Sequence, residues 1–319
     1  MSTPTLNARV VAMRWEADGV VSVEFRPATP DVVFPRYDAG SHIDLHLPNG
    51  LVRSYSLCVP SDGSRYVVGV LSDRKSRGGS KYVHEQLRVG KTLQISAPRN
   101  NFPLHEAAPR SVLLAGGIGV TPIYCMLQHL VAQDRPVDII YCARSRREAA
   151  FLAGIERLTG DKVRLTVHFD DERGGPPDLA ALLADKGADS HFYCCGPTPM
   201  LDAFEATCAK LGYPNAHIER FAAAPVVSGP EQGFLVQLQR SGKSVEVPPG
   251  KSILDALIDA GLNPEHSCKE GVCGACETRV ISGELEHRDG ILSKKERESG
   301  KTMMICVSRC TRGPLVLDA

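Results

Sequence analysis

Cys268-Lys269-Glu270-Gly271-Val272-Cys273-Gly274-Ala275-Cys276 places three cysteines on one short loop, and Cys306 follows thirty residues later. The spacing C-x4-C-x2-C…C is that of the plant-type ligands to a [2Fe–2S] cluster, in which four thiolates surround two irons. Gly271 and Gly274 give the loop the conformational freedom to turn around such a cluster. The stretch therefore predicts a one-electron centre in the last third of the chain.

Two other interpretations of these cysteines are open. A structural zinc site usually draws its ligands from two C-x2-C-type pairs, whereas here a run of three is followed by a single cysteine. Ordinary buried cysteines would not be expected at this spacing between glycines. Cys310 is a rival to Cys306 as the fourth ligand, and we prefer Cys306 because the apolar segment Met303–Val307 predicts a strand inside the fold.

Length and composition limit the remaining possibilities. The 319 residues allow two or three domains of about 100–200 residues each. The 37 basic and 37 acidic residues balance, so we expect neither a nucleic-acid nor a membrane partner. The first residues lack the basic and apolar segments of a signal peptide. Eleven cysteines, an odd number, indicate free thiols and a reducing cytoplasm rather than a disulfide framework.

Residues 1–106 show short strand-like segments separated by turn signals, which predict a small antiparallel β-barrel domain. These segments are Val10–Glu16, Val20–Arg26, Ser41–Leu47, Leu51–Val59, Tyr66–Leu71 and Thr92–Ala97. One helix, at about Ser80–Arg88, interrupts them.

Two segments of this domain could bind a ligand. In Arg53-Ser54-Tyr55-Ser56, alternate side chains share a face, so Arg53 and Tyr55 could meet one ligand, the former suiting a phosphate and the latter a ring. Gly78-Gly79-Ser80 precedes the helix, where free N–H groups favour a phosphate. Taken alone, the first segment is more often a half-buried strand and the second a plain N-cap.

Residues 107–224 alternate apolar strands with helices, which predicts a parallel, doubly wound α/β domain with its ligand at the carboxyl ends of the strands. The expected strands are Val112–Ala115, Val137–Cys142, Val163–Phe169, His191–Cys195 and His217–Phe221. The expected helices are Thr121–Gln133, Arg147–Leu158, Asp178–Ala184 and Thr198–Leu211.

The loops after these strands indicate nucleotide binding. Gly116-Gly117-Ile118-Gly119-Val120-Thr121-Pro122 joins a strand to a helix, and its glycines let the backbone approach a pyrophosphate. Cys195-Gly196-Pro197 begins another helix, although Cys195 could simply be a core residue. Asp170-Asp171-Glu172 could accept hydrogen bonds from a ribose, and a solvated acidic turn is an equal alternative.

Residues 225–319 predict a compact α+β domain around the cysteine loop, after a linker at Pro225–Gln232. Strands are expected at Phe234–Gln239, Ser244–Val247, near Glu277–Ile281, Thr302–Val307 and Leu315–Leu317, with a helix at Ile253–Ala260.

Taken together, R-S-Y-S, G-G-I-G-V-T-P, C-G-P and the C-terminal cysteine loop resemble the phthalate dioxygenase reductase-like flavoproteins, which include vanillate O-demethylase reductases. The resemblance covers essentially the whole chain. It implies an FMN barrel, an NAD domain and a C-terminal ferredoxin domain of the β-grasp type. It further implies that NADH gives a hydride to FMN and that single electrons pass through [2Fe–2S] to a Rieske-type oxygenase acting on an aromatic compound.

The resemblance also implies roles for individual residues. The FMN contacts would be Arg53, Ser54, Tyr55, Ser56, Gly79 and Ser80, with Arg53 on the phosphate, Tyr55 on the ring system and Ser56 near N5. The NADH contacts would be Gly116, Gly117, Gly119, Thr121, Asp171, Cys195, Gly196 and Pro197. Ser56, Thr121, Cys195 and Phe221 would lie at the reacting rings. The cluster ligands would be Cys268, Cys273, Cys276 and Cys306.

Some choices stay open at this level. Ser145-Arg146-Arg147 would suit the 2′-phosphate of NADPH, but the Asp170-Asp171 pair would repel it, and we favour NADH. A small, transient encounter with the oxygenase and a monomeric chain are expected. A redox-sensing regulatory protein, or a stand-alone NADH oxidase or ferric reductase, are the alternatives.

Overall fold

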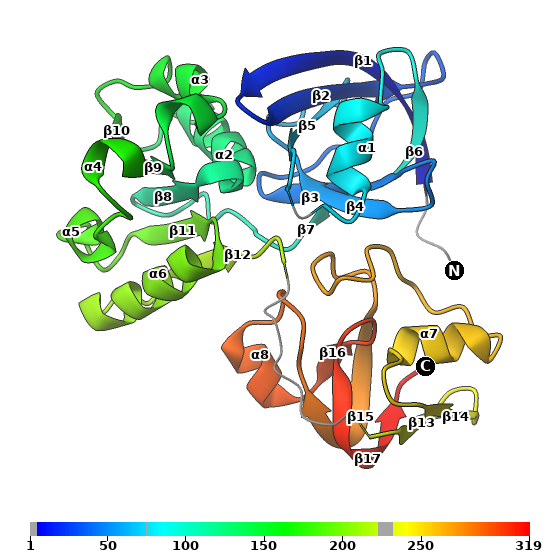
Figure 1. Cartoon of the computed structure of the whole chain (residues 1–319). Coiled ribbons are helices and arrows are strands. Elements are labelled where there is room, and N and C mark those ends of the chain that lie inside the picture. Colours follow the sequence, from blue (N-terminus) through cyan, green and yellow to red (C-terminus); the bar gives the residue numbers. More distant parts are fainter. Residues whose placement is uncertain (1–4, 75, 223–231) are drawn as a thin grey trace. The chain divides into compact units, whose positions relative to one another are not determined.

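The computed structural model describes residues 5–74, 76–222 and 232–319, which fall into two compact units, Thr5–Arg220 and Phe221–Ala319. The larger unit contains an antiparallel and a parallel sheet, and the smaller unit contains a mixed sheet (Figure 1). The predicted linker Pro225–Gln232 lies outside the described residues, apart from its last residue, Gln232. Across the described ranges, every helix is too short or too polar to cross a membrane.

The antiparallel sheet has the strand order β4-β3-β6-β1-β2-β5, with β7 paired to β3. A bridge between Leu57 and Val68 joins the end of β4 to β5 and closes the sheet into the predicted barrel. Short helix α1 (Gly79–Glu85) lies beside it and buries Val83 in the barrel core. The strands are β1 (Thr5–Ala17), β2 (Val20–Pro27), β3 (Ser41–His46), β4 (Val52–Ser56), β5 (Tyr66–Leu71), β6 (Thr92–Ser96) and β7 (Arg99–Asn100).

The parallel sheet has the order β10-β9-β8-β11-β12, and apolar side chains are buried on both of its faces. Helix α2 (Val120–Ala132) covers one face, and α6 (Thr198–Leu211) covers the other. This is the predicted doubly wound arrangement. Its strands are β8 (Ser111–Gly116), β9 (Val137–Ala143), β10 (Val163–Phe169), β11 (His191–Cys195) and β12 (Ala216–Glu219); the shorter helices are α3 (Leu152–Glu156), α4 (Asp170–Arg173) and α5 (Leu179–Leu183).

One predicted helix of this domain is wrong. Instead of a continuous helix at Arg147–Leu158, the chain forms a 3₁₀ turn at Arg146–Glu148 and then the short helix α3. Phe151 separates the two with a φ of 59°, a left-handed conformation that no α-helix contains. The apolar spacing that predicts one helix is therefore divided between two elements.

The smaller unit has a mixed sheet of order β14-β13-β17-β15-β16, in which only β13 and β17 run parallel. Helix α7 (Ile253–Asp259) packs on it and begins at Ser252, whose hydroxyl accepts the Asp255 N–H at 3.0 Å. The other elements are β13 (Phe234–Leu238), β14 (Ser244–Val247), β15 (Glu277–Glu286), α8 (Lys294–Ser299), β16 (Thr302–Met304) and β17 (Arg309–Leu317).

Candidate functional site

Two loops meet at the carboxyl edge of the parallel sheet, between β8 and β11. Helices α2 and α6 leave these two strands toward opposite faces, so this edge is the switch point where ligands bind in open α/β sheets. A Cβ on Gly119 would lie 2.2 Å from the Cys195 carbonyl oxygen, and one on Gly116 would lie 2.8 Å from Pro197 Cδ. The structure thus brings together the two loops that the sequence predicts to bind a nucleotide, and only glycine permits their contact.

The segment Arg53–Ser56 lies on β4, as predicted, with its side chains alternating in direction. Arg53 pairs across the strands with Leu45, and Tyr55 pairs with Ile43, so both lie on the core side of the barrel wall. Ser54 points the other way and donates a hydrogen bond to the buried carboxylate of Asp44.

Arg53 also reaches the start of α1. A Cβ on Gly79 would come 2.6 Å from Arg53 Cγ and 2.9 Å from its Nε, so the arginine side chain lies directly against this glycine. The Ser80 hydroxyl accepts the Asp73 N–H at 3.3 Å. A guanidinium beside the backbone at the beginning of a helix suits a phosphate group.

Glu219, at the end of β12, is a site residue that the sequence reasoning missed. Its Oε2 accepts a hydrogen bond from Ser56 Oγ at 3.3 Å and lies 4.0 Å from the thiol of Cys195. Burial raises the pKa of this carboxyl to about 8, although the Ser56 hydrogen bond lowers it. Burial also raises the pKa of Cys195. Near neutral pH the carboxyl and the thiol both hold their protons, and they lie where barrel and sheet meet.

The sequence offers one signal for Glu219. It is an acidic residue near the carboxyl end of a predicted strand, in Ile218-Glu219-Arg220-Phe221. Phe221, expected at the reacting rings, is 42% exposed and begins the smaller unit, so its role stays a prediction.

Thr121 lies on α2 between the sheet and the barrel. It is 2% exposed, its hydroxyl donates to the Ile118 carbonyl at 3.0 Å, and its methyl faces Gly69 of β5, where a Cβ would come within 2.7 Å. Asp171 is exposed at the start of α4, and its N–H donates to the Arg144 carbonyl at 3.0 Å. Both residues therefore lie near the carboxyl edge of the parallel sheet, where the two nucleotide loops meet. Their predicted roles stay predictions.

The four cysteines of the predicted cluster are all buried, and Cys306 lies against the loop. A hydrogen bond between the thiols of Cys276 and Cys306 lowers the pKa of Cys276 and raises that of Cys306. Cys310 instead points its sulfur at the Arg312 carbonyl, 2.9 Å away. Within the described ranges, no three His, Cys, Asp or Glu side chains converge on a point that would hold one metal ion. Four thiolates around two irons need a wider spacing.

The predicted strand around Cys306 is wrong in its extent. Strand β16 ends at Met304, and Cys306 lies in the turn that follows. Its apolar neighbour Ile305 is fully buried, because the turn packs into the core of the smaller unit. Cys306 is therefore set by a turn against the cysteine loop, whereas Cys310 is the residue that lies on a strand, β17.

A buried carboxylate, Asp289, stabilises the segment that is hydrogen-bonded to the cysteine loop. Asp289 is 1% exposed, its Oδ2 accepts the Leu292 N–H at 2.8 Å, and the Arg297 guanidinium lies 3.7 Å from the same oxygen. The next residue, Gly290, donates its N–H to the Gly271 carbonyl at 2.9 Å. Asp289 thus holds the segment that is bonded to the middle of the loop.

The family comparisons agree with the two site regions. Residues 236–311 match the 2Fe-2S iron-sulfur cluster binding domain, and residues 113–206 match the oxidoreductase NAD-binding domain. The first match contains all four predicted ligands and decides between an iron–sulfur cluster and zinc.

Curated relatives align over nearly their full length. The chain is 45% identical to the phenoxybenzoate dioxygenase subunit beta of Ectopseudomonas oleovorans, covering 98% of this chain and 97% of the relative. It is 43% identical to the vanillate O-demethylase oxidoreductase of Pseudomonas sp. (strain HR199 / DSM 7063), covering 97% and 98%.

Solved structures share the complete fold. Phthalate dioxygenase reductase, described as a modular structure for electron transfer from pyridine nucleotides to [2Fe–2S], is 33% identical with a TM-score of 0.72, over 99% of this chain and 98% of that one. An intact type IV self-sufficient cytochrome P450 monooxygenase is 39% identical with a TM-score of 0.87, and the chain spans 41% of its length.

The contact at Gly119 predicts a steric effect. Gly119→Ala should weaken nucleotide binding and lower the free energy of unfolding by about 1–3 kcal/mol, because the new methyl group meets backbone rather than a movable side chain. NAD⁺ titration and urea denaturation measure both. Gly160→Ala is the control, since a Cβ there meets nothing within 4 Å. Equal behaviour of the two variants would contradict the close approach.

The Glu219 carboxyl predicts a pH dependence of stability. Between the ordinary Glu pKa of about 4.3 and the raised value of about 8, the folded state keeps a proton that the unfolded state has lost. Stability should therefore fall as pH rises through this window and level off above it. Glu219→Gln should flatten the fall, as followed by the melting temperature from pH 5 to 9. Glu205→Gln, on the exposed face of α6, should leave it unchanged, and a parallel fall in both variants would argue against this assignment.

Asp289 predicts a role in retaining the cluster. Asp289→Asn should cost about 1–3 kcal/mol, since it weakens charge-assisted hydrogen bonds in a buried place. The iron and sulfide content per chain, and the rate at which the visible absorbance is lost in urea, should show earlier release. Asp318→Asn is the control, because Asp318 pairs with the exposed Arg240 in the same unit. Unchanged cluster loss in Asp289→Asn would refute the supporting role.

Proposed function

The chain belongs to the phthalate dioxygenase reductase-like family, and from this membership we propose that it is the NADH-dependent reductase component of a two-component oxygenase or O-demethylase system. It is a flavin and iron–sulfur oxidoreductase. The observation that carries the proposal is near full-length similarity to reductases of such systems in a chain whose nucleotide loops, barrel arginine and buried cysteines are all present.

We assign one cofactor to each of three domains. Residues 1–106 form the FMN barrel, 107–224 the NAD domain and 225–319 the ferredoxin domain. The barrel and the parallel sheet belong to one compact unit, Thr5–Arg220, so an FMN on the barrel can share a site with the nucleotide. The closed barrel and the 3-2-1-4-5 order of the parallel strands support these boundaries.

For FMN, the residues present fit a phosphate and a ring. Arg53 and Gly79 adjoin at the start of α1 and, with Ser80, would hold the phosphate. Tyr55, half-buried against the barrel core, would pack on the ring system, and Ser56 would lie near its N5. Ser54 supports the strand from its other face through Asp44.

For the dinucleotide, the paired turns at the switch point would hold the pyrophosphate and nicotinamide halves. Gly116, Gly117 and Gly119 would supply backbone to the pyrophosphate, and Cys195-Gly196-Pro197, against which Gly116 and Gly119 pack, would lie beside the nicotinamide. Asp171, exposed beyond β10, would accept the ribose hydroxyls. An acidic side chain at this place favours NADH over NADPH.

For the cluster, Cys268, Cys273, Cys276 and Cys306 would be the four ligands. Their burial matches a redox centre shielded from water, and the thiol contact between Cys276 and Cys306 supports Cys306 over Cys310. The Glu270 N–H already points at Cys268 Sγ, 3.3 Å away, as a donor that tunes a cluster thiolate would.

Bound FMN would supply the exchange between the two-electron chemistry of NADH and the one-electron chemistry of the cluster. The chain's own contribution is to orient the bound cofactors and to exclude water from the site. Thr121 and Cys195 are fully buried and close the site from the sheet side. Glu219, whose pKa burial raises to about 8, keeps its proton near neutral pH and accepts a hydrogen bond from the Ser56 hydroxyl, so it could serve as a proton donor in this part of the site.

The electron acceptor would be a Rieske-type terminal oxygenase acting on an aromatic compound, met in a small transient complex by a monomeric reductase. The cysteines of the structure are all free and buried, which suits the reducing cytoplasm. A haem monooxygenase is the second candidate acceptor, favoured by the 39% identity to the self-sufficient P450.

The route of the electrons gives a direct test. Cys273→Ser should still let NADH bleach the flavin but should lose cytochrome c reduction, because the outlet for single electrons is removed. Cys310→Ser is the matched control and should retain both activities and full iron content. Stopped-flow absorbance and steady-state cytochrome c assays separate these steps. Failure of NADH to bleach the flavin in the wild type would overturn the reductase function, and iron loss in Cys310→Ser would overturn the ligand assignment.

A further inference from the structure

A cavity of about 560 Å³ lies between the barrel and helices α2 and α3, within the larger unit. It falls in the range of small-molecule sites. None of the residues assigned above to FMN or to the dinucleotide lines it; its walls include Arg14, Arg65, Tyr124, Phe151 and Arg157. The lining of the cavity is therefore distinct from the residues assigned to the cofactors.

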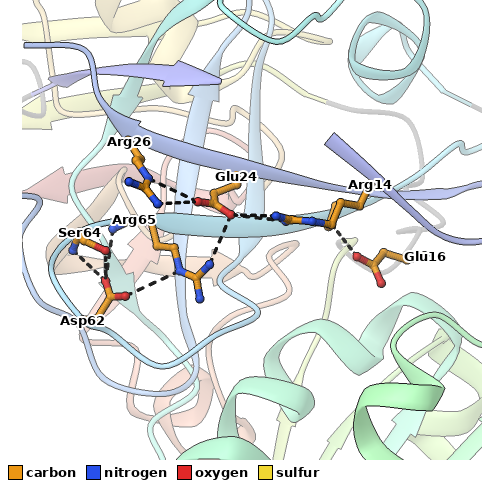
Figure 2. Close-up of polar contacts among 8 residues, drawn as sticks. Arg14, Glu16, Glu24, Arg26, Asp62, Ser64 and Arg65 are labelled. Carbon is orange, nitrogen blue, oxygen red and sulfur yellow. Dashed lines mark hydrogen bonds and ion pairs between the residues drawn. The ribbon is translucent and has the colours of Figure 1, made fainter. Parts of the chain in front are cut away.

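The barrel wall of the cavity is an arginine cluster built on one carboxylate. Glu24 of β2 is 4% exposed, and its two oxygens lie 3.3–3.4 Å from the guanidinium groups of Arg14, Arg26 and Arg65 (Figure 2). Asp62 supplies a second, more distant carboxylate to Arg65, at 3.7 Å. Glu24 and Asp62 offset two of the three guanidinium charges, and their ion pairs hold Arg14 and Arg65 in place.

The helix wall carries two donors that face the cavity. Tyr124 reaches it because residue 154 is glycine, where a Cβ would lie 2.4 Å from the phenol oxygen. Arg157 is exposed and close enough to act on the pKa of Tyr124. Among the described residues, the Arg157 guanidinium and the Tyr124 hydroxyl have no ion-pair or side-chain hydrogen-bond partner.

The cavity also has negative charge, and both carboxylates are engaged. Glu16 accepts a hydrogen bond from Ser22 Oγ at 2.6 Å, and Glu156 pairs with Arg146 at 3.4 Å. Four arginines and two glutamates line the cavity. Arg14, Arg65 and Arg146 are each paired with a carboxylate, so the positive charge open to a ligand is chiefly that of Arg157.

An aromatic surface lies between these charged walls. The rings of Phe151 and Tyr124 stack with centroids 5.3 Å apart and an interplanar angle of 22°. Phe151 takes its left-handed backbone conformation here, a strain that bulky side chains rarely carry and that is common at ligand sites. Val59, Val67 and Leu152 add to the apolar part of the lining.

We propose that this cavity binds a small arenecarboxylate, with the carboxylate on Arg157 and the Tyr124 hydroxyl and the flat ring against Phe151. Arginine recognises a carboxylate through paired N–H donors, and both guanidinium and aromatic faces accept a ring. Arg14 and Arg65, held by Glu24, lie on the opposite wall and offer further N–H donors. The site would sense an aromatic acid independently of the cofactors.

The test is a calorimetric titration of the flavin- and cluster-loaded protein with benzoate, in the presence of saturating NAD⁺. Benzoate should bind with one-to-one stoichiometry, and benzamide and inorganic phosphate should bind at least about tenfold more weakly, since each lacks the charge or the ring. Arg157→Gln should weaken benzoate binding by about tenfold, the worth of a charge-assisted contact.

Arg164→Gln is the matched control, because Arg164 is an exposed arginine on β10, in the same unit as Arg157 but outside the cavity. Arg164→Gln should bind benzoate as the wild type does. Arg157→Gln and Arg164→Gln should both show the wild-type circular dichroism spectrum and the wild-type rate of flavin reduction by NADH. Unchanged binding in Arg157→Gln, equal binding of phosphate or benzamide, or displacement of benzoate by NAD⁺ would each overturn the proposal. None of these outcomes alters the reductase function, which the NADH and cytochrome c assays test separately.

Discussion

The close approach of two backbone turns, Gly116–Gly119 and Cys195–Pro197, is the constraint on which the nucleotide site depends. The carbonyl of Cys195 occupies the space where any side chain at Gly119 would begin. Because the turns follow neighbouring parallel strands whose helices leave toward opposite faces, their N–H groups open on one edge of the sheet. The barrel adds its residues to this edge through the contact between Ser56 and Glu219.

Buried carboxylates recur where this structure must fix a position. Glu219 stays protonated because burial raises its pKa, and it joins barrel and sheet without an ion pair. Asp289 is paired with Arg297 and fixes the segment behind the cysteine loop, while Glu24 gathers three arginines on the outer barrel wall. A buried charge is tolerated only with such partners, so each carboxylate specifies the arrangement of the groups around it.

The reductase function follows from the different cofactor sites that the barrel, the parallel sheet and the cysteine loop provide. A barrel that presents Arg53 and Tyr55 on one side of a strand, a sheet edge made of glycine turns, and a loop of buried cysteines correspond to three cofactors of different chemistry. The family membership joins them in one electron-transfer chain. The arginine-lined cavity contains none of the residues assigned to the three cofactors.

Local sequence patterns determined the three-part architecture, most strand positions and the cysteine loop, because strand alternation, glycine turns and ligand spacing are properties of short segments. Tertiary structure decided what depends on distant contacts. Phe151 breaks the expected helix at 147–158, Cys306 lies in a turn rather than on a strand, and Glu219 meets Ser56 across 163 positions of sequence. Its raised pKa likewise follows from burial between two domains, which no local pattern records. The same holds for the cavity, whose walls come from segments that only folding brings together.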